Sequence, residues 1–196
     1  MNENEFKGTL ARWSHQWLVA AQRQAGRAFE AARSDPEGYS WVETELLLFV
    51  DALNNMRRAA LAVVGPASVA IQRFDEEVPG LKDLRDQLEH HDEYVAGRGR
   101  LQRRAGTDPD QSYWAIGLDG STTQLNLEPA KQRLRFRVHS RGRNVNGKFE
   151  DVSSRHIDVG PAVRAGHTLV ADVLRAAGVE PGQLMADIEA WCNAEL

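Results

Sequence analysis

The sequence predicts a mainly α protein, a helical bundle that carries a small antiparallel β-hairpin or sheet as an insertion. Up to residue 96, and again after about residue 160, apolar residues recur every three or four positions, as on an amphipathic helix. Between residues 112 and 152 they alternate with polar residues, as on a half-buried strand. We therefore expect one domain with three segments: a helical bundle over 1–96, a basic loop and small sheet over 97–157, and C-terminal helices over 158–196 that pack on the bundle.

The first expected helix runs to about residue 32 and ends before the breakers Ser34-Asp35-Pro36 and Gly38. Its apolar residues step by four, three, four and three positions, which places them on one helix face. Most of these residues are aromatic, and we expect their stripe to lie in the core: Phe6, Leu10, Trp13, Trp17 and Ala20.

The next two helices have clear start and stop signals. Ser40 and Glu43 form an S-x-x-E capping box, which predicts where the second helix begins. Residues 46–50 and Leu53 are apolar nearly all round, so we expect this helix to be central and to end at Gly65-Pro66. A short third helix is expected before Pro79-Gly80, with these apolar positions: Val69 or Ala70, Ile71, Phe74 and Val78.

A fourth helix is expected from Leu81 to Ala96, with Gly97 and Gly99 as its stop, followed by a loop over 98–111. Its core stripe would consist of Leu81, Leu84, Leu88, His91 and Val95. Its opposite, polar face would consist of Arg85, Asp86, Glu89, His90 and Glu93. Asp86 and His90 lie four residues apart, as do Arg85 and Glu89, so that both pairs can touch on a helix.

The strand-like segment has three alternating runs: Trp114, Ile116 and Leu118; Leu125 and Leu127; and Leu134, Phe136 and Val138. Asp119-Gly120 is typical of a hairpin turn. Residues 141–147 are expected to form a turn and residues 149–152 a further strand. The helical period then returns from about Pro161 to Gly178, and the last short helix would carry Leu184, Ile188 and Trp191.

Basic residues gather in the middle of an otherwise acidic chain. Residues 98–155 carry 12 Lys and Arg against 6 Asp and Glu, although the whole chain has a net charge of −4. A basic strip can track a phosphate backbone, so we assign substrate binding to five arginines: Arg98, Arg100, Arg133, Arg135 and Arg137. The alternative for the last three is an edge strand protected by charge.

Composition indicates a cytoplasmic protein. Cys192 is the only cysteine, so that no internal disulfide can form. The N-terminal residues show no signal-peptide pattern, and no apolar run approaches the roughly 18 residues that a membrane span needs.

Arg85 to His90, with the sequence R-D-Q-L-E-H, matches an R-x4-6-H pattern on an amphipathic helix, and His91 also fits the spacing. In this setting the chain resembles the HEPN superfamily, small helical domains many of which are metal-independent ribonucleases. The resemblance covers the motif helix and the bundle over 1–96, and does not extend to the strands after residue 112. In that family a polar residue, often Asn, follows the arginine, and here Asp86 takes that place.

The resemblance implies acid–base cleavage of RNA without metal or cofactor, in a toxin-like or defence-like protein with a possible antitoxin partner. A 2′-hydroxyl would attack the adjacent phosphate. His90 would move the proton, since histidine ordinarily titrates near neutrality. Arg85 would stabilise the phosphate charge, and Asp86 would orient His90. Because Arg85 and His90 point apart on one helix, we expect a homodimer whose two motif helices form a shared cleft.

Two further interpretations remain open from the sequence. Residues 89–93 are rich in Glu, Asp and His and could hold a metal, although they point all round the helix and no H-E-x-x-H occurs. The same residues are also typical of a solvated acidic helix. In that case the chain would be a non-catalytic interaction protein that uses its dimer face or its basic hairpin.

Overall fold

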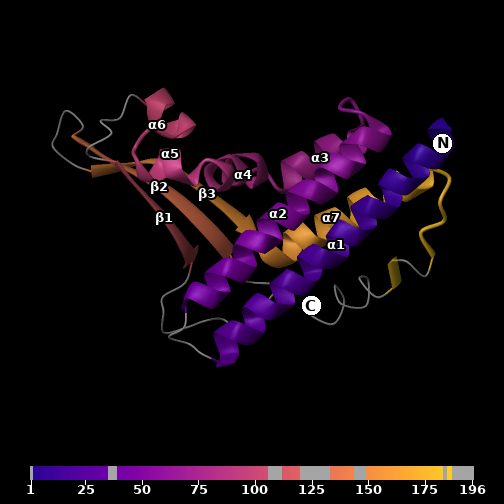
Figure 1. The fold of residues 1–196 in the computed structure, drawn as a ribbon, viewed down its shortest axis with the longest axis horizontal. Coiled ribbons are helices and arrows are strands. Elements are labelled where there is room, and N and C mark those ends of the chain that lie inside the picture. The colour runs from indigo at the N-terminus through magenta and orange to yellow at the C-terminus, as the bar shows by residue number, and fades with distance from the viewer. Residues whose placement is uncertain are drawn as a thin grey trace.

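A computed structural model of the chain describes residues 2–34, 39–105, 112–119, 133–143, 149–182, 185 and 186 (Figure 1). Side chains are described over 2–31, 44–104 and 156–182 and at 185 and 186. This part of the chain forms helices α1 to α7 and one antiparallel sheet of three strands. The mainly α class with a small antiparallel insertion is therefore confirmed.

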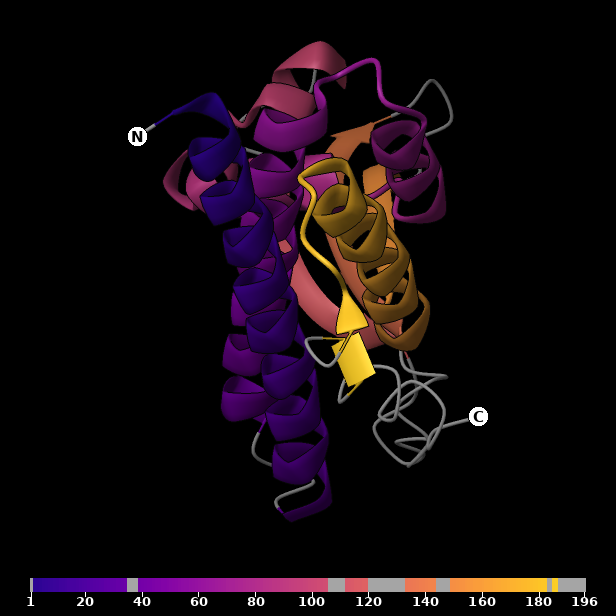
Figure 2. The ribbon, with the colours of Figure 1, turned by 90° about the vertical axis from the view of Figure 1, so that its right-hand side faces the viewer.

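Three helices form the body of the molecule. α1 (Glu3–Ser34) and α2 (Tyr39–Val64) are long neighbours, and α7 (Val159–Ala176) packs against both (Figure 2). A Cβ at Gly166 of α7 would lie 2.9 Å from Leu18 Cδ1 and 3.0 Å from Met56 Sδ, so that glycine allows this close approach. The expected ends of all three helices agree with the structure to within a few residues.

The buried face of α1 differs from the expected one. Small residues contribute most of it: Ala11, Ser14, Leu18, Ala21, Ala25 and Ala28. The aromatic stripe lies beside this face, where Trp13 is 54% exposed, Phe6 is 47% exposed and Trp17 is only partly buried. The prediction that the aromatic stripe forms the core was therefore wrong. Alanines let the helix axes come close together, whereas a row of indole rings would hold them apart.

The apolar run of α2 lies where the sequence placed it. Leu46, Phe49, Val50 and Leu53 are all buried in the main core. α2 begins at Tyr39, next to the expected capping box, although the side chains of Ser40 and Glu43 lie outside the described ones. The short α3 (Val69–Glu77) follows, with Ser68 as its N-cap accepting a hydrogen bond from the Ala70 N–H at 3.3 Å.

The expected helix over 81–96 is two helices. α4 (Leu81–Glu89) ends at His90, whose φ of −119° and ψ of 34° are not helical, and α5 (His91–Val95) begins directly after it. This change of direction buries Tyr94 completely and leaves His91 exposed and Val95 63% exposed. The prediction that His91 and Val95 face the core was therefore wrong, because it assumed one continuous helix.

The segment after Gly99 is also helical where a loop was expected. α6 (Arg100–Ala105) is a helix of six residues that packs near β2 and β3. Leu101 forms a small second cluster with Tyr94, separate from the main core. The short α4, α5 and α6 follow one another along one end of the sheet (Figure 1).

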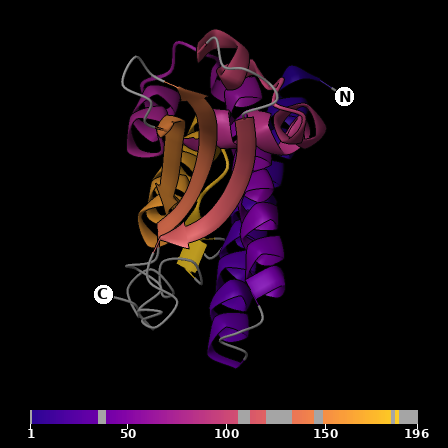
Figure 3. The ribbon, with the colours of Figure 1, turned by 90° about the vertical axis from the view of Figure 1, so that its left-hand side faces the viewer.

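The sheet has the order β1-β2-β3 with both pairs antiparallel (Figure 3). β1 (Ser112–Asp119), β2 (Arg133–Arg143) and β3 (Phe149–Asp158) include all the expected strands of the described part. β2 is the middle strand, so that the edge-strand interpretation of its arginines was wrong. β2 also runs to Arg143, into the expected turn. The expected strand at Leu125 and Leu127, Gly120 of the expected hairpin turn, and the expected last helix (Leu184, Ile188 and Trp191) lie outside the described residues.

Register assigns the two faces of the sheet. Leu134 pairs with Ile157, which is buried in the main core, and Arg135 pairs with His156, which is exposed. Because paired residues share a face and neighbours alternate, the apolar positions of β2 belong to the core face. The positions of Arg133, Arg135 and Arg137 belong to the opposite face, most of which no described helix covers (Figure 3).

Candidate functional site

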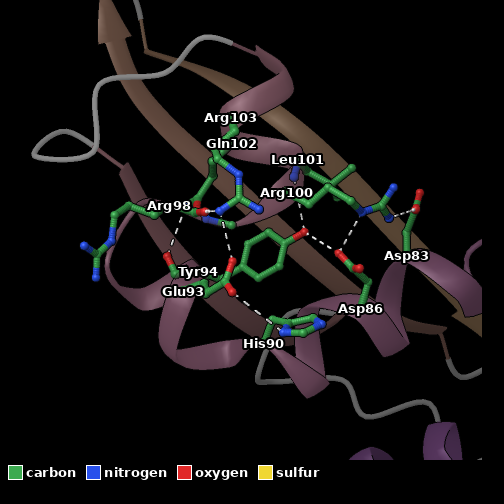
Figure 4. A network of polar contacts seen from close by, with 11 residues as sticks. Asp83, Asp86, His90, Glu93, Tyr94, Arg98, Arg100, Leu101, Gln102 and Arg103 are labelled. Carbon is green, nitrogen blue, oxygen red and sulfur yellow. Dashed lines mark hydrogen bonds and ion pairs between the residues drawn. The ribbon is translucent and has the colours of Figure 1, made fainter.

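Tyr94 is the centre of a polar cluster between α4, α5 and α6 (Figure 4). Its hydroxyl donates a hydrogen bond to Asp86 Oδ2 at 2.9 Å and accepts one from the Leu101 N–H at 3.3 Å. Its carbonyl oxygen accepts a hydrogen bond from Gln102 Nε2 at 3.1 Å. One tyrosine therefore joins three short helices, of which only α4 reaches the main core, through Leu81 and Leu84.

Two carboxylates of α4 hold α6 through one arginine. Arg100 Nε donates to Asp86 Oδ2 at 3.1 Å, and its terminal nitrogen donates to Asp83 Oδ1 at 3.2 Å. Asp86 thus accepts from both Tyr94 and Arg100, in place of the expected contact with His90. Within one chain Asp86 holds the cluster together, and it shares only a small pocket with His90.

Two glycines shape the turn between α5 and α6. Gly97 has a φ of +71°, which favours glycine over residues with a Cβ. A Cβ at Gly99 would overlap the Tyr94 ring, so that the ring fits only against a glycine backbone. The Gly99 N–H donates to Gln102 Oε1 at 2.8 Å, which ties this turn to the same buried glutamine that holds the Tyr94 carbonyl.

His90 lies at the junction of α4 and α5 and faces a small pocket of about 120 Å³. The side chain is 53% exposed, and its Nδ1 lies 3.9 Å from Glu93 Oε1. Asp86, Glu93, Arg100 and Arg103 also line the pocket. Arg103 donates to Glu93 Oε2 at 3.0 Å and to the Arg98 carbonyl oxygen. The pocket therefore combines an exposed histidine with two guanidinium groups that carboxylates hold in place.

Arg85 belongs to a different cavity. It donates to Glu89 on the next turn of α4, as the i,i+4 spacing predicts. Its Nε is buried and has no hydrogen-bond partner in the described structure. The cavity beside Arg85 lies between α2, α3 and α4, and His90 does not line it. The R-x4-H pair is therefore not brought together within one chain.

The predicted substrate-binding arginines fall into two groups. Arg100 lines the His90 pocket but is engaged by Asp83 and Asp86, whereas the exposed Arg98 side chain does not line it and points away from His90 (Figure 4). The other three, Arg133, Arg135 and Arg137, share the outer face of β2 by register, and their side chains lie outside the described ones.

Two pKa values in the cluster are shifted by its geometry. Burial raises the pKa of Tyr94 to about 12, with the neighbouring Asp86 carboxylate acting in the same direction. The pKa of Arg100 is raised mainly by its hydrogen bond to Asp86, so this guanidinium stays charged. Both shifts favour the protonated forms that the cluster needs.

Sequence reasoning missed Tyr94 and Gln102, and it gave Gly99 only the role of a helix stop. The signal for Tyr94 was present, since an aromatic residue precedes the close pair Gly97 and Gly99 and can pack where glycine leaves room. Among the described side chains, no three His, Cys, Asp or Glu groups gather as a metal-binding set. Among the described helices, none is long and apolar enough to cross a membrane.

No family model, curated protein or solved structure matches this chain. The chemistry of the two cavities therefore carries the functional argument.

Proposed function

We propose that this protein is a metal-independent endoribonuclease that acts as a homodimer, with His90 as the proton carrier. The observation that carries the proposal is the His90 pocket, where an exposed imidazole lies beside Arg100 and Arg103. Acid–base cleavage of RNA needs a proton carrier and cations near the phosphate, and it needs no metal. The resemblance of Arg85 to His90 to the HEPN motif supports the same chemistry.

The homodimer supplies what one chain lacks. Arg85 and His90 line different cavities of one chain, so that a site containing both needs a second copy. We propose that the outer surface of α4 and α5 forms the two-fold contact. Light scattering should then give twice the chain mass at micromolar concentration, and a monomer there would contradict this arrangement.

The test is an RNA cleavage assay in the presence of EDTA. We expect wild-type protein to cleave RNA and to leave DNA intact, because DNA lacks the 2′-hydroxyl nucleophile. His90→Ala should lower the rate by roughly 10²–10⁴-fold, and Arg85→Ala should do comparable damage with the fold intact. His91→Ala is the matched control, since this neighbouring histidine is also exposed and lines neither cavity.

Two outcomes would refute the ribonuclease proposal. One is that wild-type protein leaves a broad panel of RNAs intact. The other is that His90→Ala cleaves as fast as the His91→Ala control.

The basic face of β2 would contribute RNA affinity. Affinity should then fall steeply with salt, because binding to phosphates releases counterions. Charge reversal at Arg133 and Arg135 should make the slope of log affinity against log salt concentration shallower, by about one for each phosphate contact that is lost. An unchanged salt dependence would assign this face no part in RNA binding.

The exposed aromatic residues of α1 favour a second candidate, a non-catalytic interaction protein. Phe6 and Trp13 lie on one face of α1, and large exposed apolar residues gathered on a helix face are typical of protein contacts. An antitoxin that holds the protein inactive would be one such partner. This candidate takes the place of the first if the cleavage assay fails.

A further inference from the structure

A second cavity, beside Arg85, has a chemically distinctive lining. It has a volume of about 470 Å³, within the range of small-molecule sites. Three elements form it: α2, the α3 segment with the turn after it, and α4. The lining consists of Asn54, Arg57, Arg58, Leu61, Asp75, Val78, Pro79, Leu81, Lys82 and Arg85.

Positive charge dominates this lining, with four basic residues against one carboxylate. Asp75 is already engaged, because Arg57 holds both of its oxygens at 2.5 Å in a two-bonded pair. Arg58 and Lys82 are exposed and have no ion pair in the described part of the structure. Three cations therefore remain around the cavity after the Arg57–Asp75 pair is set aside, and only Arg85 has a carboxylate partner, Glu89.

Arg85 also carries a polar atom that lacks a partner. Arg85 lines the cavity, and its Nε is buried without a hydrogen bond in the described structure. A buried unpaired donor on a charged group is costly and is commonly explained by a bound ligand, ion or water. Asn54, which is nearly fully buried, adds an amide to the lining.

We propose that this cavity binds a phosphorylated small molecule of about mononucleotide size. Its phosphate would lie among Arg58, Lys82 and Arg85, because a phosphate carries nearly two charges and offers several acceptor oxygens to guanidinium groups. Its uncharged part would lie against Leu61, Val78 and Pro79 on the apolar side of the lining. The cavity shares Arg85 with the proposed ribonuclease site, but His90 does not line it, and binding of the ligand does not require RNA cleavage.

The test is isothermal titration of the full chain with AMP and with adenosine. AMP should bind, and adenosine, which lacks the phosphate, should bind at least about tenfold more weakly. Arg58→Ala combined with Lys82→Ala should lower AMP affinity by about tenfold or more, and neither residue is buried or ion-paired in the described structure, so the fold should persist. Arg23→Ala combined with Arg27→Ala removes the same charge from the exposed surface of α1 and is the matched control.

A short 5′-phosphorylated RNA, compared with its 5′-hydroxyl form, distinguishes the two sources of the phosphate. Binding of the phosphorylated RNA as tightly as AMP would assign the cavity to RNA ends, and weaker binding would assign it to free nucleotides. The proposal is overturned if AMP does not bind, if adenosine binds equally well, or if the α1 control variant loses as much affinity as the cavity variant. Because no RNA cleavage is measured, this result is independent of the ribonuclease test.

Discussion

The main apolar core, which α4 joins through Leu81 and Leu84, and the hydrogen-bonded cluster around Tyr94 are stabilised in different ways. The core consists of many buried apolar side chains, each of which contacts several others. The Tyr94 cluster has only Tyr94 and Leu101 as buried apolar members among the described residues and relies on directed hydrogen bonds. The stability of the core depends on how completely its volume is filled, and the stability of the Tyr94 cluster depends on complete pairing of its polar groups. Different substitutions should therefore destabilise each.

The largest expected effect tests the core. Phe49 of α2 is fully buried, and Phe49→Ala would leave a cavity among long helices that cannot collapse into it. We expect a loss of about 3–5 kcal/mol in the free energy of unfolding, measured by denaturant melts. Leu48→Ala is the matched control, because Leu48 is 46% exposed and should cost much less. Equal losses for the two variants would mean that α2 does not bury the face described.

The next effect tests the polar cluster. Tyr94→Phe keeps the ring and removes the hydroxyl that joins Asp86 to the Leu101 N–H. We expect a loss of about 1–3 kcal/mol, because two polar groups lose a partner while the volume hardly changes. Faster hydrogen exchange should appear in α5 and α6 and not in α2. A uniform change over the whole chain would contradict the view that the cluster is a separate unit.

Alkaline pH should weaken the same cluster. The pKa of Tyr94 is raised in the folded protein from its ordinary value of 10 to about 12. A raised folded pKa contributes stability that is fully present below about pH 10 and is lost as the pH rises through about 12. The difference in unfolding free energy between wild type and Tyr94→Phe should therefore shrink between about pH 9 and about pH 11.5. A constant difference over this range would show that the Tyr94 hydroxyl titrates normally.

The sequence predicted the long helices well and the cluster poorly, for physical reasons. Gly65-Pro66 and Pro79-Gly80 end helices through local backbone chemistry, which can be read without knowing the fold. The break at His90 has no glycine or proline, and what accompanies it is the burial of Tyr94 under α6, a contact that periodicity does not contain. The two faces of α1 were confused because hydrophobicity favours tryptophan, whereas close helix packing favours alanine.

In the candidate site, too, contacts within one helix could be predicted from the sequence and contacts between helices could not. The i,i+4 pair of Arg85 and Glu89 could be predicted, because it depends only on helix geometry. The partners of Asp86 could not, because Tyr94 and Arg100 reach it only after the chain turns at His90 and again at Gly97. Arg85 and His90, which the sequence placed on one continuous helix, therefore line two different cavities.

The smallest expected effect tests the break between α4 and α5 at His90. On a continuous helix His91 would lie on the Leu84 stripe, and His91→Ala would remove a packed side chain. In the structure His91 is exposed at the first position of α5, so that His91→Ala should change the free energy of unfolding by no more than about 0.5 kcal/mol. Val95→Ala should be equally mild, since Val95 is 63% exposed. A loss above about 1.5 kcal/mol for either variant would instead support one continuous helix over residues 81–96, with His91 buried and Tyr94 on the surface.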